Sequence, residues 1–241
     1  MTAKGLGQLT VGVWAVLTLG PGVASPPAVA QPSAPGPVTF AAEDGASLAG
    51  RVFGQGANWV VLAHMPVTHD QRSWADFAEL VGRDGLTALT FDFRGHGGSA
   101  GQRDLARLDR DVRAALKFAL DRGARKVLLV GASLGGTAVL KVAAAADVTG
   151  VIAVAASPSG GGLSVSHAEV AAIKAPKLFI VGVLDRCAVC VQGARDWMRV
   201  ATEPKELKEF GESAHGTDLF SSPSRQPFID VMFAFIRKSL N

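Results

Sequence analysis

Several features that would assign this chain to a familiar class of protein are missing from its 241 residues. No internal repeat of about 20 to 50 residues is present, which excludes a solenoid or a propeller. The 28 glycines and 12 prolines follow no three-residue period, so the chain is not collagen-like. Lysine and arginine are scattered despite a net charge of +3. Without a basic stripe, nucleic acid is not expected as a partner.

Charged residues are scarce as well, at 19% of the chain, whereas 48% of the residues are hydrophobic. This composition excludes a disordered protein and is ordinary for a packed α/β domain. Because a domain usually has roughly 100 to 200 residues, the length predicts one folded domain.

The first 30 residues contain a single charged side chain, that of Lys4. An apolar run follows over residues 9–19, too short for the roughly 20 residues that cross a bilayer. Ala28-Val29-Ala30 then provides a small-residue cleavage site. This order predicts a signal peptide over 1–30, a linker over 31–37 and a folded domain over 38–241. We expect an exported protein, periplasmic or secreted, with no stable membrane anchor after cleavage; an uncleaved anchor or a mis-assigned start codon is the alternative.

Beyond the linker, short β-rich runs alternate with longer helical patterns. Strands are expected over 38–40, 47–53, 59–63, 86–93, 126–130, 151–155, 177–184 and 205–210, and helices over 72–81, 104–120, 134–146, 191–200 and 228–239. The first two strands are expected to form an antiparallel pair. The alternation predicts an α/β fold with a mostly parallel central sheet flanked by helices. Because such sheets bind ligands at the carboxyl ends of their strands, the loops after the strands are the candidate site.

One of these loops carries a G-x-S-x-G sequence, Gly131-Ala132-Ser133-Leu134-Gly135. It follows a predicted strand directly and opens a predicted helix, which is the setting of a nucleophile elbow. Glycines on both sides of Ser133 permit a close approach of strand and helix. The helix N-terminus favours negative charge that develops at the serine. Ser133 is therefore the candidate nucleophile; the alternative is a serine that only caps the helix.

With this elbow, residues 38–241 resemble the α/β-hydrolase superfamily, in particular its small lidless members such as dienelactone-hydrolase-like and acyl-esterase-like enzymes. The resemblance rests on Gly131–Gly135, on the stretch 92–99 (DFRGHGGS), on Asp185 and on His215. It implies the α/β-hydrolase fold, the chain order Ser, Asp, His for a catalytic triad, and hydrolysis of an acyl bond. It does not imply a particular substrate.

A serine hydroxyl needs a general base, and the base needs a group that orients it. His215 lies in a loop after the last predicted strand, where the resembled family places its base; a surface histidine is the alternative. Asp185 ends a predicted strand, from which a carboxylate reaches the imidazole and fixes its tautomer. Its rivals are Asp218, which we expect to cap the last helical region, and Asp196, in a helix.

An oxyanion hole needs two backbone N–H groups. The N–H of Leu134, directly after the nucleophile, is the first candidate. The second is the N–H of Met65, in the loop His64-Met65-Pro66 after a predicted strand, where relatives often have a His-Gly pair.

Cys187 and Cys190 form the only C-x-x-C sequence. In an exported chain this pair predicts a disulfide; free thiols and a redox role are the alternatives. Arg94 and His96 are expected to tie loops together near the site, with substrate contact as the alternative. His64, His69, Asp70, Asp92 and His96 lack the spacing of known metal motifs, so no metal is expected.

These observations predict an exported serine hydrolase that cleaves carboxylic esters, or related thioesters and lactones, through a Ser-His-Asp triad and an acyl-enzyme. The substrate is a small acyl compound and no cofactor is required. Only about 20 residues separate two strands where lipases insert a lid, so no large lid is expected. The alternatives are an acyltransferase or peptidase with the same triad, or a non-catalytic binding module. The sequence assigns no oligomeric state.

Overall fold

The computed structural model describes residues 1–2 and 35–240, and these contain a folded unit that begins at Gly36. Of the predicted signal peptide and linker, residues 3–34 lie outside the described residues. The strands of the main sheet are β1 (Gly36–Ala41), β2 (Ser47–Phe53), β3 (Asn58–Ala63), β4 (Thr87–Phe91), β5 (Lys126–Ala132), β6 (Gly150–Val154), β9 (Lys177–Gly182) and β10 (Lys205–Phe210). The α-helices are α1 (Ala75–Arg83), α2 (Leu108–Asp121), α3 (Leu134–Ala143), α4 (His167–Ala172), α5 (Ala188–Val200) and α6 (Arg225–Leu240).

The main sheet has eight strands in the order β1-β2-β4-β3-β5-β6-β9-β10. β1 pairs with β2 and β2 pairs with β4 in antiparallel fashion, and the remaining pairs are parallel. The sequence prediction of a mostly parallel sheet opened by an antiparallel pair is confirmed. Because β3, β5, β9 and β10 are parallel, the loops that follow them leave the same edge of the sheet.

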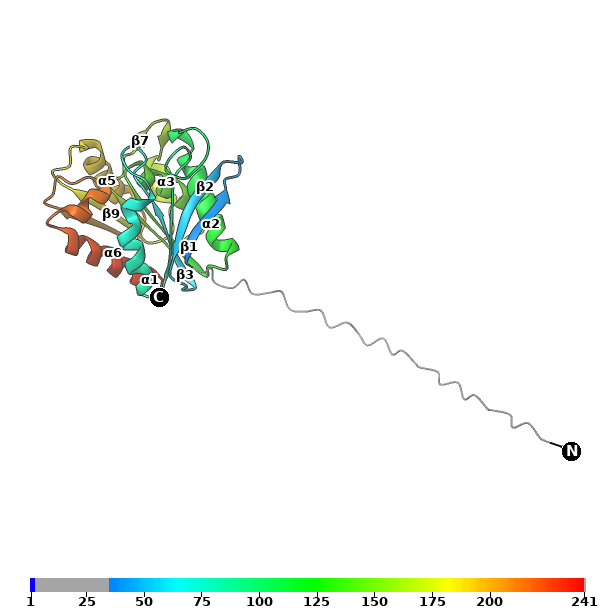
Figure 1. The fold of residues 1–241 in the computed structure, drawn as a ribbon. Helices are drawn as coiled ribbons and strands as arrows, with labels where there is room; N and C mark the ends of the chain where they lie inside the picture. Colours follow the sequence, from blue (N-terminus) through cyan, green and yellow to red (C-terminus); the bar gives the residue numbers. More distant parts are fainter. Residues whose placement is uncertain (3–34, 241) are drawn as a thin grey trace.

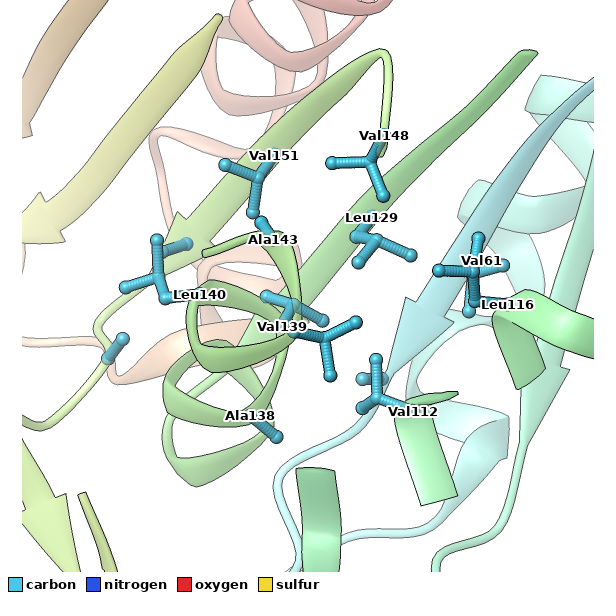
Figure 2. Packing of buried hydrophobic residues seen from close by; sticks show 14 of the residues in the cluster. Val61, Val112, Leu116, Leu129, Ala138, Val139, Leu140, Ala143, Val148 and Val151 are labelled. Atoms are coloured by element: carbon cyan, nitrogen blue, oxygen red, sulfur yellow. The ribbon is translucent and has the colours of Figure 1, made fainter. Parts of the chain in front are cut away.

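Helices cover both faces of the sheet (Figure 1). Alternate residues of each buried strand point to opposite faces, so Val61 and Leu129 belong to one core and Val60 and Leu128 to the other. The first core packs against α2, α3 and α5, and the second against α1 and α6. Figure 2 shows the first core, where side chains of α2 and α3 meet those of β3, β5 and β6. Burial on both faces explains the continuous apolar runs of these strands.

Some boundaries and elements differ from the sequence prediction. β9 ends at Gly182 instead of residue 184, because the N–H of Asp185 donates to the carbonyl of Gly182 at 3.1 Å and turns the chain out of the strand. The predictions also missed α4 and the hairpin formed by β7 (Ser159–Gly160) and β8 (Leu163–Ser164). They missed three short 3₁₀ helices, η1 (Gln71–Trp74), η2 (Leu105–Arg107) and η3 (Gly216–Ser221), of which η1 and η2 lie where longer α-helices were expected.

No large lid covers the sheet edge in the described part of the chain. The crossover from β6 to β9 holds only the β7–β8 hairpin and the six-residue helix α4. Among the described residues, no helix has both the length and the apolar character required to cross a membrane.

Candidate active site

Ser133 lies on the sharp turn between β5 and α3. Its backbone has φ 53° and ψ −128°, a conformation that is costly for a residue with a side chain. The neighbouring strand β6 holds the turn in place, because the Ser133 N–H donates to the carbonyl of Val154 at 2.9 Å. The Ser133 side chain does not cap α3. This arrangement is the strained strand–turn–helix elbow that the sequence predicted, and the capping alternative fails.

The glycines around Ser133 are required by close backbone contacts. A Cβ atom on Gly131 would lie 2.3 Å from the carbonyl oxygen of Gly135, and one on Gly135 would lie 2.3 Å from the carbonyl oxygen of His64. Both distances are too short for any side chain. The first turn of α3 is thereby pressed against β5 on one side and against the loop after β3 on the other.

His215 contacts Ser133 from the loop between β10 and η3. Its Nε2 lies 2.9 Å from the Ser133 Oγ, and its Nδ1 lies 2.6 Å from the Oδ2 of Asp185. A carboxylate only accepts hydrogen bonds, so Nδ1 donates and Nε2 is left to accept the serine proton. The structure thus brings together Ser133, His215 and Asp185, which lie far apart in the sequence, in the geometry of a serine, a base and an orienting acid.

The two rival carboxylates lie elsewhere. Asp218 is in the first turn of η3 and pairs with His69 at 3.2 Å, so it does not cap the last helix as we expected. Asp196 is on α5, where it contacts Gln192 and Arg199.

Asp185 is held from its other side by the start of α5. Its Oδ1 accepts a 2.8 Å hydrogen bond from the N–H of Cys187, and its side chain is only 2% exposed. Cys187 is joined to Cys190 by a disulfide, as the sequence predicted. The disulfide closes the first turn of α5, and that turn fixes the donor that orients the carboxylate.

The loop after β3 lies next to the elbow. Ala63 pairs with Gly131 across the parallel strands, so Met65 and Ser133 leave the sheet at the same level. Leu134 begins α3, and its N–H therefore has no partner within the helix. The Met65 side chain is buried and faces Gly216, where a Cβ atom would lie 2.3 Å from the Met65 Sδ. Met65 thus contacts the loop that carries His215.

His64 fixes the shape of this loop through its side chain, a role that the sequence analysis did not assign to it. Its Nδ1 donates to the carbonyl of Met65 at 3.1 Å, and its Nε2 accepts from the N–H of Phe93 at 3.1 Å. This pattern requires the neutral ring. Burial lowers the pKa of His64 to about 4, which keeps the ring neutral at neutral pH.

Arg94 and His96 tie loops together, as expected. The buried Arg94 guanidinium binds Asp111 on α2 at 2.6 Å and Asp44, in the turn between β1 and β2, at 2.7 Å. The His96 ring contacts the carbonyls of Arg94 and Pro66. Asp92 accepts from the N–H groups of Gln71 and Gly98.

Ser133 lies directly after the carboxyl end of β5, at the edge of the sheet. Ser133 is half-buried, and the β7–β8 hairpin lies close to it, since a Cβ atom on Gly160 would lie 2.8 Å from the Leu134 side chain. Cavities of about 410 and 560 Å³ lie beside the loops of Asp92 and His96 and are not lined by Ser133. Neither cavity therefore reaches the Ser133 hydroxyl.

Comparison with protein families identifies the class. Residues 60–233 match the model of the alpha/beta hydrolase family, so the chain belongs to that family. A comparison with curated proteins finds no match.

Solved structures share the fold. The esterase Pf2001 of Pyrococcus furiosus is 16% identical with a TM-score of 0.71, over 86% of this chain and 92% of that one. The esterase domain of a Rhodothermus marinus protein is 23% identical with a TM-score of 0.69, over 86% and 100%. The monoacylglycerol lipase of Paleococcus ferrophilus is 22% identical with a TM-score of 0.66, over 77% and 96%.

Proposed function

We propose that this α/β hydrolase is an exported serine hydrolase that cleaves carboxylic esters through an acyl-enzyme. The observation that carries the proposal is the unbroken series of hydrogen bonds from Ser133 through His215 to Asp185. The names of the similar structures support it, because two of them are esterases and one is a monoacylglycerol lipase. The N-terminal sequence, with its apolar run and Ala-Val-Ala site, supports export.

In the proposed mechanism the Ser133 Oγ attacks the ester carbonyl while His215 Nε2 takes its proton. The imidazolium that forms is stabilised by the Asp185 carboxylate at Nδ1. His215 then returns the proton to the leaving alcohol, and an acyl group remains on Ser133. Water, deprotonated by the same histidine, attacks this acyl group and releases the acid.

The N–H groups of Met65 and Leu134 are the proposed oxyanion hole, which donates hydrogen bonds to the negatively charged oxygen of the substrate. Leu134 belongs to the elbow and Met65 to the loop after β3, and the close approach of Gly135 to the His64 carbonyl brings these two segments together. Such a pair of donors, fixed before the reaction, stabilises the tetrahedral intermediate without reorganisation. The hydrogen bond from His64 Nδ1 to the carbonyl of Met65 fixes the backbone of Met65 and so supports its N–H as a donor.

The half-buried position of Ser133 and the short β6–β9 crossover support a small acyl compound as the substrate. Thioesters and lactones present the same carbonyl chemistry as esters. A non-catalytic binding module, the alternative from another class, would not require a serine hydroxyl held at 2.9 Å from an imidazole that is itself oriented by a buried carboxylate. The geometry therefore favours catalysis.

The test is hydrolysis of a series of p-nitrophenyl esters that differ in acyl length. We expect the wild type to release p-nitrophenol and the free acid, and Ser133→Ala to reduce kcat by at least about 10⁴-fold with an unchanged circular dichroism spectrum. Ser157→Ala is a matched control, because the Ser157 hydroxyl bonds only to the carbonyl of Ser159 and should keep the activity within a few-fold. Equal activity of wild type and Ser133→Ala would contradict the proposal. Transfer of the acyl group to an added alcohol without free acid would identify an acyltransferase.

A further inference from the structure

The start of α5 places two potential metal ligands beside the proposed base, which offers a third. The Sγ atoms of Cys187 and Cys190 and a ring nitrogen of His215 all lie within 4.8 Å of one another. His215 comes from the loop after β10, so the fold and not the local sequence brings the imidazole to the C-x-x-C pair. In the disulfide form the two sulfurs are bonded to each other and offer no thiolate.

The position of the cysteines favours thiolates once the disulfide is open. Cys187 is the N-cap residue of α5, a helix of 13 residues, and Cys190 lies in its first turn. The positive end of the helix dipole stabilises negative charge on sulfur atoms at this position. Cys187 is half-buried and Cys190 buried, so a reductant approaches the sulfur of Cys187 first.

We propose that reduction of this disulfide by a dithiol creates a Zn²⁺ site formed by Cys187, Cys190 and His215, and that Zn²⁺ bound there inhibits the hydrolase. The dithiol gives two electrons and becomes a cyclic disulfide, and its two protons pass to the cysteine sulfurs. Zn²⁺ then replaces the two thiol protons, which are released to water, and accepts the lone pair of one imidazole nitrogen. A water molecule fills the fourth position of the tetrahedron.

The distances suit zinc after small movements. Zn–S bonds of about 2.3 Å and Zn–N bonds of about 2.0 Å place the ligand atoms of one ion roughly 3.5 to 4 Å apart. The present atoms are within 4.8 Å, and the two sulfurs separate when their bond is broken. Two residues between the cysteines is a spacing that is common in zinc sites.

Inhibition follows from the two bonds that His215 already makes. Its Nδ1 holds Asp185 and its Nε2 holds Ser133. Zinc at either nitrogen removes one of these partners and leaves no basic imidazole for the serine proton. This consequence rests on the proposed function, whereas zinc binding itself does not.

The experiment uses Co²⁺ as a spectroscopic probe, because cobalt in a tetrahedral thiolate site gives visible bands and a thiolate charge-transfer band. The full protein is reduced with dithiothreitol, freed of it by gel filtration without oxygen, and titrated with Co²⁺. We expect one Co²⁺ per reduced chain, displaced by Zn²⁺, and no bands from the disulfide form. His215→Ala should weaken binding roughly tenfold or more. Circular dichroism records whether the reduced chain is folded.

Ester hydrolysis is measured on the same samples. One equivalent of Zn²⁺ should abolish the activity of the reduced wild type, and a chelator should restore it. The activity that remains in the Cys187→Ser, Cys190→Ser double variant should not respond to that amount of Zn²⁺.

Three results would overturn the proposal: no cobalt bands from folded, reduced protein, unfolding on reduction, or equal affinity in His215→Ala. Cobalt binding by a protein that hydrolyses no ester in any state would support the metal site and contradict the proposed function.

Discussion

Asp185 and Asp218 lie 30 and three residues from His215 in opposite directions along the chain, and the structure assigns them different partners. The distant carboxylate contacts the imidazole of His215, because β9 and β10 are neighbours and end at the same sheet edge. The nearby one contacts His69 and is half exposed. Proximity in sequence therefore does not decide which acid orients the base.

This difference gives a prediction for the two variants Asp185→Asn and Asp218→Asn. An amide at residue 185 carries no negative charge to balance the positive charge of the His215 imidazolium, and it also permits the wrong tautomer of the neutral ring. The value of kcat should therefore fall by about 10⁴-fold. The Asp218 variant keeps the Ser133–His215–Asp185 contacts and should stay within a few-fold of the wild type. Steady-state kinetics on one p-nitrophenyl ester compares them. A larger loss in Asp218→Asn would show that the assignment of the acid is wrong.

Single residues also mark the limit of the sequence analysis. That Ser133, Asp185 and His215 come together was predictable, because each follows a recognisable strand and the family resemblance supplies their order. The structural role of His64 was not, since it depends on a contact with Phe93, which follows a different strand. Nor did the sequence indicate that the cysteine pair lies against His215.

At the scale of elements, the long apolar strands and amphipathic helices were predicted to within a few residues. The short ones were not. α4 begins with a capping box, in which Ser166 and Glu169 bond to each other's backbone N–H groups. That Ser-x-x-Glu spacing was a usable signal. The β7–β8 hairpin has only two residues in each strand, and its place depends on packing against Leu134, which no local pattern reveals.

The loop after β3 should make stability depend on pH through His64. Burial lowers the pKa of His64 to about 4 from the 6.5 of an exposed histidine. Above pH 6.5 the ring is neutral in both states. Between 6.5 and 4 only the unfolded chain takes up the proton, so this residue's contribution falls by up to about 3 kcal/mol as the pH drops. Below pH 4 no further loss arises from it.

Urea unfolding of the wild type and of His64→Gln from pH 7 to 4 measures this effect. Glutamine does not titrate, so the free energy of unfolding of the variant should fall less steeply with decreasing pH, whatever its stability at pH 7. Parallel curves for the two proteins would contradict the assignment of a buried, neutral His64.

At the scale of the whole molecule, Arg94 joins segments that the sheet alone does not connect. It links the loop after β4 to α2 and to the β1–β2 turn. Arg94 lowers the pKa of Asp44 to about 2, whereas burial raises the pKa of Asp111 even though Arg94 opposes that rise. Asp111 is fully buried, so its charge depends on this partner.

Arg94→Ala should therefore lower the free energy of unfolding by about 3 to 5 kcal/mol, because it leaves a buried carboxylate without its partner. Arg72→Ala is the matched control. Arg72 pairs with Asp70 at 2.6 Å, but its side chain is 86% exposed, and its loss should leave the urea midpoint nearly unchanged. Equal midpoints for wild type and Arg94→Ala would show that this network does not hold the loops together.

The central claim is that Ser133 is an activated nucleophile, and fluorophosphonate labelling tests it most directly. Purified protein is treated with the probe, weighed by intact-mass spectrometry and digested to map the adduct. We predict one adduct per chain, on Ser133, and none in Ser133→Ala or in wild type whose histidines are blocked beforehand with diethyl pyrocarbonate. A folded protein that forms no adduct, or an adduct on another residue, would contradict the account.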